Sequence, residues 1–162
     1  RDWSSDVCSS DLAFAGLLIS FLNDVGDGGA VQQAQAVTYD AGLAMRRQVL
    51  GDAWVDKSLA GRTPFNTDYQ AMITRIAWNE IWTRPGLDQR TRRLLVIAMT
   101  AALGRWEEFR LHVRSGLQQG GFTRDELKEV LMQTGISAGV PAANTAFAEA
   151  ADVMAEIDKT TG

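Results

Sequence analysis

Apolar residues recur at steps of three and four along most of the chain, and no segment alternates apolar and polar residues over a useful length. The first pattern places apolar side chains on one face of an α-helix, whereas the second is typical of a half-buried strand. Runs of β-branched residues, which favour strands, are also missing. The sequence therefore predicts an all-α protein, a bundle of about six or seven helices joined by short turns.

Capping and stop residues predict where several of these helices begin and end. An amphipathic helix is predicted from a cap at Asn66 or Thr67 to the RPG stop at 84–86. Residues 94–103 are apolar nearly all round, which indicates a central, buried helix. The T-x-x-E sequence at 123–126 is a capping box and marks another helix start.

Composition excludes several classes of protein. The chain has 162 residues, of which 46% are hydrophobic and 22% charged, as in an ordinary globular domain. Its net charge of −4 lacks the basic excess of a general nucleic-acid-binding protein. The apolar stretch at 13–22 is too short to span a bilayer. We therefore expect a cytoplasmic protein with no nucleic-acid or membrane partner.

The chain is predicted to have three parts. Residues 1–12 (RDWSSDVCSSDL) resemble a translated sequencing-adapter string, so we exclude them from the fold. Residues 13–30 are predicted to be a short helix followed by a flexible break at GDGG, and residues 31–162 the main domain. Cys8, the single cysteine, lies in the excluded string. No disulfide, cysteine-based metal site or redox dithiol is then available, and we expect no metal.

The only histidine in the sequence lies in a polar arrangement with helical spacing. Arg105, Glu108 and His112 are three and four residues apart, so their side chains can share one helix face. Glu108 accepting a hydrogen bond from His112 would raise the pKa of the imidazole, and Arg105 would hold an anion nearby. Charge pairs at this spacing are also ordinary on solvated helices, and spacing alone favours that interpretation.

Three long sequences carry a resemblance that changes this balance. EIWTRPGLD, ALGRWEEFRLHVR and AGVPAANTAF are similar to segments of the carboxymuconolactone decarboxylase family, within a match from about Tyr39 to Met154. The resemblance implies an AhpD-like helical bundle. It departs at Ser137, where many relatives have a tyrosine. AhpD-like alkylhydroperoxidases carry cysteines where this chain has Arg105 and Glu108, so their thiol chemistry is excluded here.

The activity that the resemblance implies is decarboxylation of 4-carboxymuconolactone to 3-oxoadipate enol-lactone in protocatechuate catabolism, by the β-ketoadipate pathway. This small lactone dicarboxylate supplies its own electron sink, so no cofactor is expected. His112 is then the expected proton donor, oriented by Glu108, with Arg105 as a third catalytic residue. The alternative is a non-catalytic oligomerising or ligand-binding member of the same helical superfamily.

Further arginines are candidates for binding the substrate carboxylates, because the guanidinium fork matches a carboxylate. They are Arg84 and, at the start of the buried helix, Arg92 or Arg93. For one of the latter two, a solvated first helical turn is the preferred interpretation.

Three other residues are candidates for substrate binding. Glu80 either orients an arginine or caps its own helix end. Trp82 is expected in the pocket wall or in subunit packing, and Asn144 either donates to the developing oxyanion or caps the last helix.

The resemblance also implies assembly and an origin for the N-terminal part. Family members are homo-oligomers, often hexamers built as trimers of dimers, and we expect a homo-oligomer here. In some bacteria this decarboxylase is fused behind 3-oxoadipate enol-lactonase, an α/β-hydrolase that ends in an apolar helix. Residues 13–30 are expected to be a remnant of such a fused enzyme.

Overall fold

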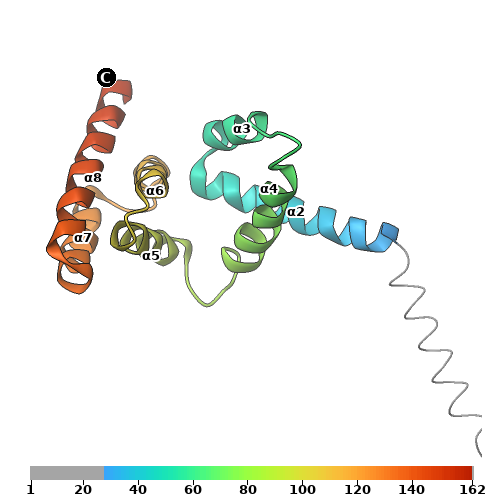
Figure 1. Ribbon diagram of the computed structural model, residues 1–162, viewed down its shortest axis with the longest axis horizontal. Coiled ribbons are helices and arrows are strands. Elements are labelled where there is room, and N and C mark those ends of the chain that lie inside the picture. The colour runs from blue at the N-terminus through green and yellow to red at the C-terminus, as the bar shows by residue number, and fades with distance from the viewer. Residues whose placement is uncertain (1–27, 162) are drawn as a thin grey trace, which may run out of the picture. The chain divides into compact units, whose positions relative to one another are not determined.

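The computed structural model describes residues 28–161 (Figure 1). Its elements are α2 (Gly28–Leu50), α3 (Asp52–Ala60), α4 (Thr67–Ile73), the π-helix η1 (Thr74–Ile81), α5 (Gln89–Ala102), α6 (Trp106–Gln118), α7 (Arg124–Ala138) and α8 (Val140–Thr161). No strand occurs among these described residues, which confirms the all-α prediction. Within the same range, no helix is long and apolar enough to cross a membrane.

The chain divides into two compact units, 1–40 and 41–162, and each is described by itself. The described part of the first unit is the beginning of α2, which starts at Gly28. The flexible break expected at 26–29 is therefore helical in its second half. The adapter-like string and the helix predicted at 13–25 lie outside the described residues.

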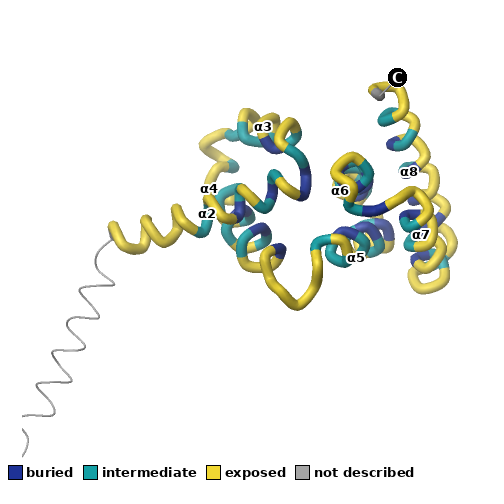
Figure 2. The backbone as a smooth tube through the Cα atoms, turned by 180° about the vertical axis from the view of Figure 1, so that it is seen from behind, coloured by how far each residue is buried: buried dark blue, intermediate teal, exposed yellow. Residues whose placement is uncertain are grey.

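The second unit has two buried clusters. In the first, α5, α6, α7 and α8 pack together, and their buried positions lie on the sides that face one another (Figure 2). Its fully buried side chains include Ile97, Phe109 and Leu131. The second cluster joins the end of α2 to α3 and η1. Its buried side chains include Val49, Val55, Trp78 and Trp82. Leu111 of α6 packs against it.

Side-chain caps begin α5 and α7, whereas Asn66, at the predicted start of α4, makes no side-chain cap hydrogen bond. The Asp88 carboxylate accepts a hydrogen bond from the Thr91 N–H at 2.6 Å, and α5 begins at the next residue. Thr123 and Glu126 form the reciprocal capping box of α7. Gly51 ends α2 with φ of +86°, a conformation that favours glycine. The local sequence therefore determines these three boundaries.

The helix predicted between residues 66 and 84 changes type midway. It is α-helical to Ile73 and continues as a π-helix from Thr74, whose side chain is fully buried. A Cβ atom on Gly42 would lie 2.0 Å from the Thr74 carbonyl oxygen, so only glycine lets α2 approach η1 this closely. In this arrangement Trp78 and Trp82 of the segment stack with ring centroids 5.2 Å apart.

Ion pairs join α6 to α8. Arg110 donates to Glu149 at 2.6 Å and to Glu156 at 2.8 Å, and Arg114 also pairs with Glu156. The hydrogen bond from Arg114 is the main cause that lowers the pKa of Glu156. These partly exposed pairs each contribute about 0.2–1 kcal/mol, but together they fix the orientation of the helix that carries His112.

Candidate active site

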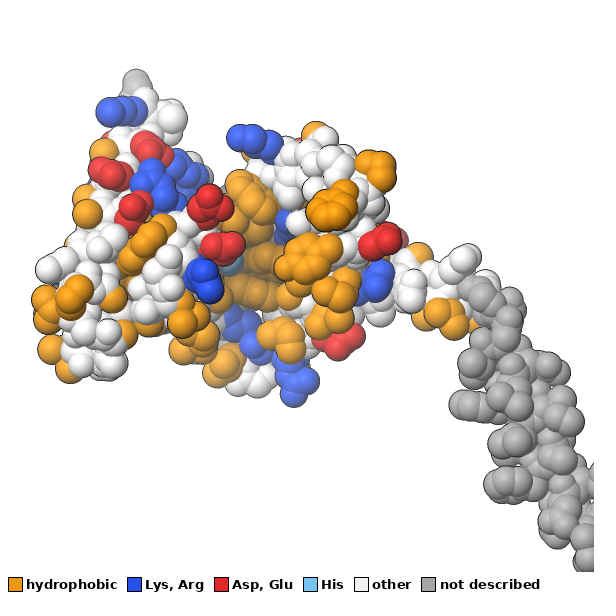
Figure 3. All heavy atoms as spheres, in the orientation of Figure 1, with side chains coloured by type: hydrophobic (Ala, Val, Ile, Leu, Met, Phe, Trp, Pro, Cys, Tyr) orange, Lys and Arg blue, Asp and Glu red, His pale blue; other side chains and the backbone are white. Residues whose placement is uncertain are grey.

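Glu108 and His112 lie in the wall of a hollow of about 480 Å³, which we call the His112 hollow. Its lining residues come from four helices and the π-helix: Arg46, Leu50, Trp54, Tyr69, Gln70, Ile73, Trp78, Glu107, Glu108, Leu111 and His112. Figure 3 shows a hollowed, largely hydrophobic surface on this face, with acidic side chains beside it. The volume suits a small organic ligand.

His112 is half-buried in α6, and its environment disfavours the imidazolium. Its ring lies parallel to that of Trp82, and its Nδ1 is buried without a hydrogen-bond partner among the described residues. Burial, and to a lesser degree the charge of Arg93, lowers the pKa of His112 to about 4. The expectation of a raised pKa is therefore wrong for the free protein, in which the ring is neutral at pH 7.

Glu108 reaches the same hollow as His112 but does not orient it by a hydrogen bond. Glu108 is exposed in the first turn of α6, and no hydrogen bond joins it to His112 in the described part of the chain. The stacked indole of Trp82 lies against the imidazole instead. Both side chains line one cavity, as their spacing predicts, whereas the predicted contact between them is not formed.

Arg105 lies outside this arrangement. It is the N-cap of α6, with ψ of +72°, and the helix begins at Trp106. Gly104, with φ of +64°, turns the chain immediately before it. Arg105 still accepts the first backbone hydrogen bond of the helix, from the Phe109 N–H at 2.9 Å. Its exposed side chain is not part of the lining of the hollow, and its predicted role beside His112 stays a prediction.

Arg92, one of the arginines predicted to bind substrate, stabilises a loop. It donates to the carbonyl oxygen of Arg84 at 3.0 Å and to that of Leu87 at 3.2 Å. These bonds hold the connection between η1 and α5 and indicate a structural role for Arg92. Arg84 takes part in them only through its backbone carbonyl, and neither arginine lines the His112 hollow.

Of the other residues predicted to bind substrate, some lie near His112 and others do not. Glu80 and Asn144 are exposed and do not line the hollow. Trp82 is buried, with 9% of its surface exposed, and packs behind His112. Of the three, the structure brings only Trp82 to the histidine.

Two buried arginines near the site were missed or undervalued by sequence reasoning. Arg93 donates to the carbonyl oxygens of Val49 at 2.8 Å and Gln48 at 3.3 Å, which satisfies the end of α2. Arg46 lines the His112 hollow itself. A signal for Arg46 was available, since it lies three and four residues from Leu43 and Leu50 on the apolar face of its helix.

No group of three or more histidine, cysteine, aspartate or glutamate residues with metal-binding geometry occurs within residues 28–161. The polar side chains in the lining of the hollow include an imidazole, a guanidinium, two carboxylates, the Tyr69 hydroxyl and the Gln70 amide. Such a set can bind an anion and move a proton.

Comparison with known proteins gives consistent matches. The sequence model of the carboxymuconolactone decarboxylase family matches residues 67–152. The chain is 44% identical over 119 residues to 4-carboxymuconolactone decarboxylase of Acinetobacter baylyi, covering 74% of this chain and 88% of that protein. It is 35% identical over 103 residues to nitrosuccinic acid decarboxylase npaB of Metarhizium robertsii, covering 64% of this chain and 71% of that protein.

Proposed function

Because this chain belongs to the carboxymuconolactone decarboxylase family, we propose that it converts 4-carboxymuconolactone to 3-oxoadipate enol-lactone and CO₂ in the cytoplasm. The observation that carries the proposal is the 44% identity to a decarboxylase of this substrate over 88% of that protein's length. The His112 hollow, of about 480 Å³, provides a cavity of suitable size with a histidine and an arginine in its wall.

The proposed reaction uses the substrate's own ring as its electron sink. The bond between the ring carbon and its carboxylate breaks, and CO₂ leaves without the electron pair. That pair moves through the ring double bond to the lactone carbonyl oxygen and forms a dienolate. A proton added at the carbon next to the carbonyl gives the enol-lactone. The protein must therefore bind a dianion, stabilise the oxyanion and supply one proton.

His112 is our proposed proton donor, and substrate binding is what charges it. The ring is neutral in the free protein because its pKa is about 4. A dianion bound beside it favours the imidazolium and raises the pKa, since opposite charges within a few ångströms attract strongly in a buried site. We propose that Glu108, which is exposed and lines the same hollow, passes a proton from solvent to the ring. Substrate binding and protonation of the His112 imidazole are thus coupled.

The proposal is tested by supplying the lactone and measuring loss of its absorbance together with release of CO₂. Wild type should turn over, and His112→Ala should lose about 10²- to 10⁴-fold in kcat, the usual contribution of a positioned general acid. Full activity in His112→Ala would remove the histidine from the mechanism. No CO₂ from the wild type would favour the alternative, a non-catalytic ligand-binding bundle.

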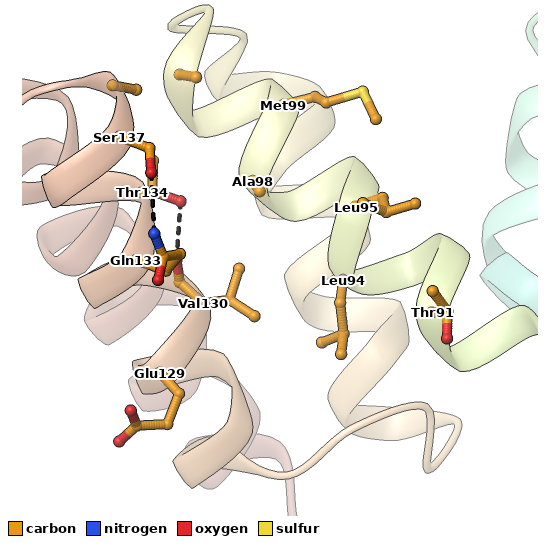
Figure 4. Close-up of a pocket in the computed structure, with 12 residues that line it drawn as sticks. Thr91, Leu94, Leu95, Ala98, Met99, Glu129, Val130, Gln133, Thr134 and Ser137 are labelled. Atoms are coloured by element: carbon orange, nitrogen blue, oxygen red, sulfur yellow. Dashed lines mark hydrogen bonds between the residues drawn. The ribbon is translucent and has the colours of Figure 1, made fainter.

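A second, apolar cavity supports self-association. A groove of about 570 Å³ runs between α5 and α7, and Leu94, Leu95 and Met99 lie along its α5 side (Figure 4). On α7, Gln133 donates to Ser137 at 2.9 Å and Thr134 donates to the Val130 carbonyl oxygen at 2.8 Å, while Glu129 lies at one end of the groove (Figure 4). Few polar atoms in the lining therefore remain to bind water or a charged ligand.

A second groove, between α7 and α8, shares Glu129 and Gln133 with the first, and we call the exposed apolar side chains of this region the apolar face. They are Leu95, Met99, Leu103, Met132, Ile136, Val140 and Phe147. A second copy of the chain carries the same face, so a symmetric pair would bury both surfaces at once. We propose that the protein is a homo-oligomer assembled through the apolar face, with a hexamer as the expected final state.

A further inference from the structure

The His112 hollow contains an arginine that the sequence patterns did not single out. Arg46 belongs to α2 and is buried, with 5% of its surface exposed. It lines the same hollow as Glu108 and His112 of α6. Of the residues that line the hollow in the described chain, Arg46 is the one with a permanently cationic side chain.

Two contacts with α3 hold the Arg46 guanidinium in place. Its Nη2 donates to the Ser58 hydroxyl oxygen at 3.0 Å, and its Cζ lies 5.2 Å from the centre of the Trp54 ring. The first contact fixes one edge of the guanidinium, and the second is a cation–π interaction. Both contacts therefore position the guanidinium in the wall of the hollow.

The charges around the hollow determine how an anion would lie in it. Glu107 and Glu108 are exposed on α6 and repel a carboxylate, whereas Arg46 attracts one. A dianionic ring in the hollow therefore directs a carboxylate toward Arg46. We propose that Arg46 binds a carboxylate of the substrate in the His112 hollow, an inference that rests on the proposed function.

Arg92 and Arg93, which were also considered for this role, donate to backbone carbonyl groups. Arg92 donates to the carbonyl oxygens of the loop before α5, including that of Arg84. Arg93 donates to the last carbonyl groups of α2. Arg46 therefore combines what the role requires: a fixed guanidinium, burial that strengthens its electrostatic attraction, and a place in the wall of the hollow.

The inference is tested by binding rather than turnover. The probe is a saturated analogue of the lactone dicarboxylate, which lacks the ring double bond and cannot form the dienolate. Binding is followed by tryptophan fluorescence, since Trp54 and Trp78 line the hollow. Arg46→Gln should weaken binding about 10- to 100-fold, as expected for loss of a charge-assisted bidentate contact. The uncharged dimethyl ester of the probe should bind wild type and variant equally.

Two further variants separate binding from folding. Arg47→Gln removes the same charge from the next residue, which pairs with Asp52 and Asp56 and does not line the hollow, and it should bind the probe as wild type does. Arg46→Lys keeps the charge but loses the fork, so its affinity should be intermediate. Circular dichroism and thermal unfolding confirm that each variant is folded.

The possible outcomes are distinct. Unchanged probe affinity in Arg46→Gln, equal losses for the diacid and its ester, or no binding by the wild type would overturn the inference. If the wild type releases CO₂ while Arg46→Gln keeps its KM, the inference fails and the proposed function stands. If the wild type binds the diacid through Arg46 but releases no CO₂, the proposed function fails and the anion site stands.

Discussion

The indole of Trp82 lies parallel to the imidazole of His112, with an interplanar angle of 3° and ring centroids 6.2 Å apart. Trp82 also stacks on Trp78, so a row of three rings leads from the π-helix to α6. The row covers the histidine on the side of Trp82 and contributes to the burial that lowers its pKa. Trp82 is therefore a positioning residue for His112.

Replacing Trp82 should raise the pKa of His112. The wild-type value is lowered to about 4 from 6.5, mainly by burial, and Trp82→Ala would let water reach the ring and move the pKa back toward 6.5. Because the sequence has a single histidine, one imidazole signal in an NMR titration reports the value directly. Trp106→Phe is the control, since Trp106 packs on Phe109. A Trp82→Ala titration identical to wild type would contradict the positioning role.

The same histidine should make stability depend on pH. The unfolded chain binds a proton at His112 near pH 6.5, whereas the folded protein binds it only near pH 4. The unfolded state holds more protons in this window, so the free energy of unfolding falls as pH falls from about 6.5 to about 4. The full loss is about 3 kcal/mol.

Urea unfolding of wild type and His112→Gln between pH 7 and pH 4 checks this pH dependence. The variant lacks the titrating group, so its free energy of unfolding should vary less across the window. Carboxylates with lowered pKa, such as Glu126 and Glu156, affect both proteins alike at the acidic end. Parallel curves for the two proteins would show that His112 is not buried as a neutral ring.

Local sequence was sufficient for the helices and for one pair of site residues. The side chains at Asp88 and Thr123 cap helices by bonding to backbone within three residues, so no distant contact is needed. Glu108 and His112 reach one cavity because both lie inside the same regular helix. Interactions of this range depend only on residue type and spacing.

The errors concern properties that depend on tertiary contacts. The direction of the His112 pKa shift depends on Trp82 and Arg93, which come from other elements. Arg46 enters the site because α3 supplies partners for its guanidinium. Arg105 is the N-cap of α6, directly after the turn at Gly104, so helical spacing describes its side chain less well than those of Glu108 and His112.

Glu108 and Arg105 should differ in their effect on catalysis. Glu108 lines the His112 hollow and is proposed to supply protons to the ring, whereas Arg105 precedes the helix and lies outside the lining. Glu108→Gln should therefore lower kcat by about 10-fold or more, within the usual range for proton-transfer groups. Arg105→Gln should lower kcat less than Glu108→Gln does. A larger loss of steady-state CO₂ release in Arg105→Gln than in Glu108→Gln would show that Arg105 belongs to the catalytic site.

Gly42→Ala should destabilise the protein. The added Cβ would lie 2.0 Å from the Thr74 carbonyl oxygen and 3.2 Å from the Asn79 backbone nitrogen, so α2 and η1 must separate. Overpacking of this kind costs about 1–3 kcal/mol in the free energy of unfolding. Gly86→Ala is the matched control, because nothing lies within 4 Å of its added Cβ. Equal urea midpoints for the two variants would contradict the close approach of α2 to η1.

Placing a charge in the apolar face should break the proposed assembly. Ile136 is 85% exposed in α7, next to the groove lined by α5. In a symmetric contact, Ile136→Glu would bury two carboxylates among apolar side chains, and an unpaired buried charge costs several kcal/mol. Light scattering coupled to size-exclusion chromatography should therefore find a smaller species. Leu87→Glu makes the same change at an exposed leucine between η1 and α5 that lines neither groove, and should leave the mass unchanged. A wild type that is already monomeric, or an Ile136→Glu variant of undiminished mass, would rule out assembly through this face.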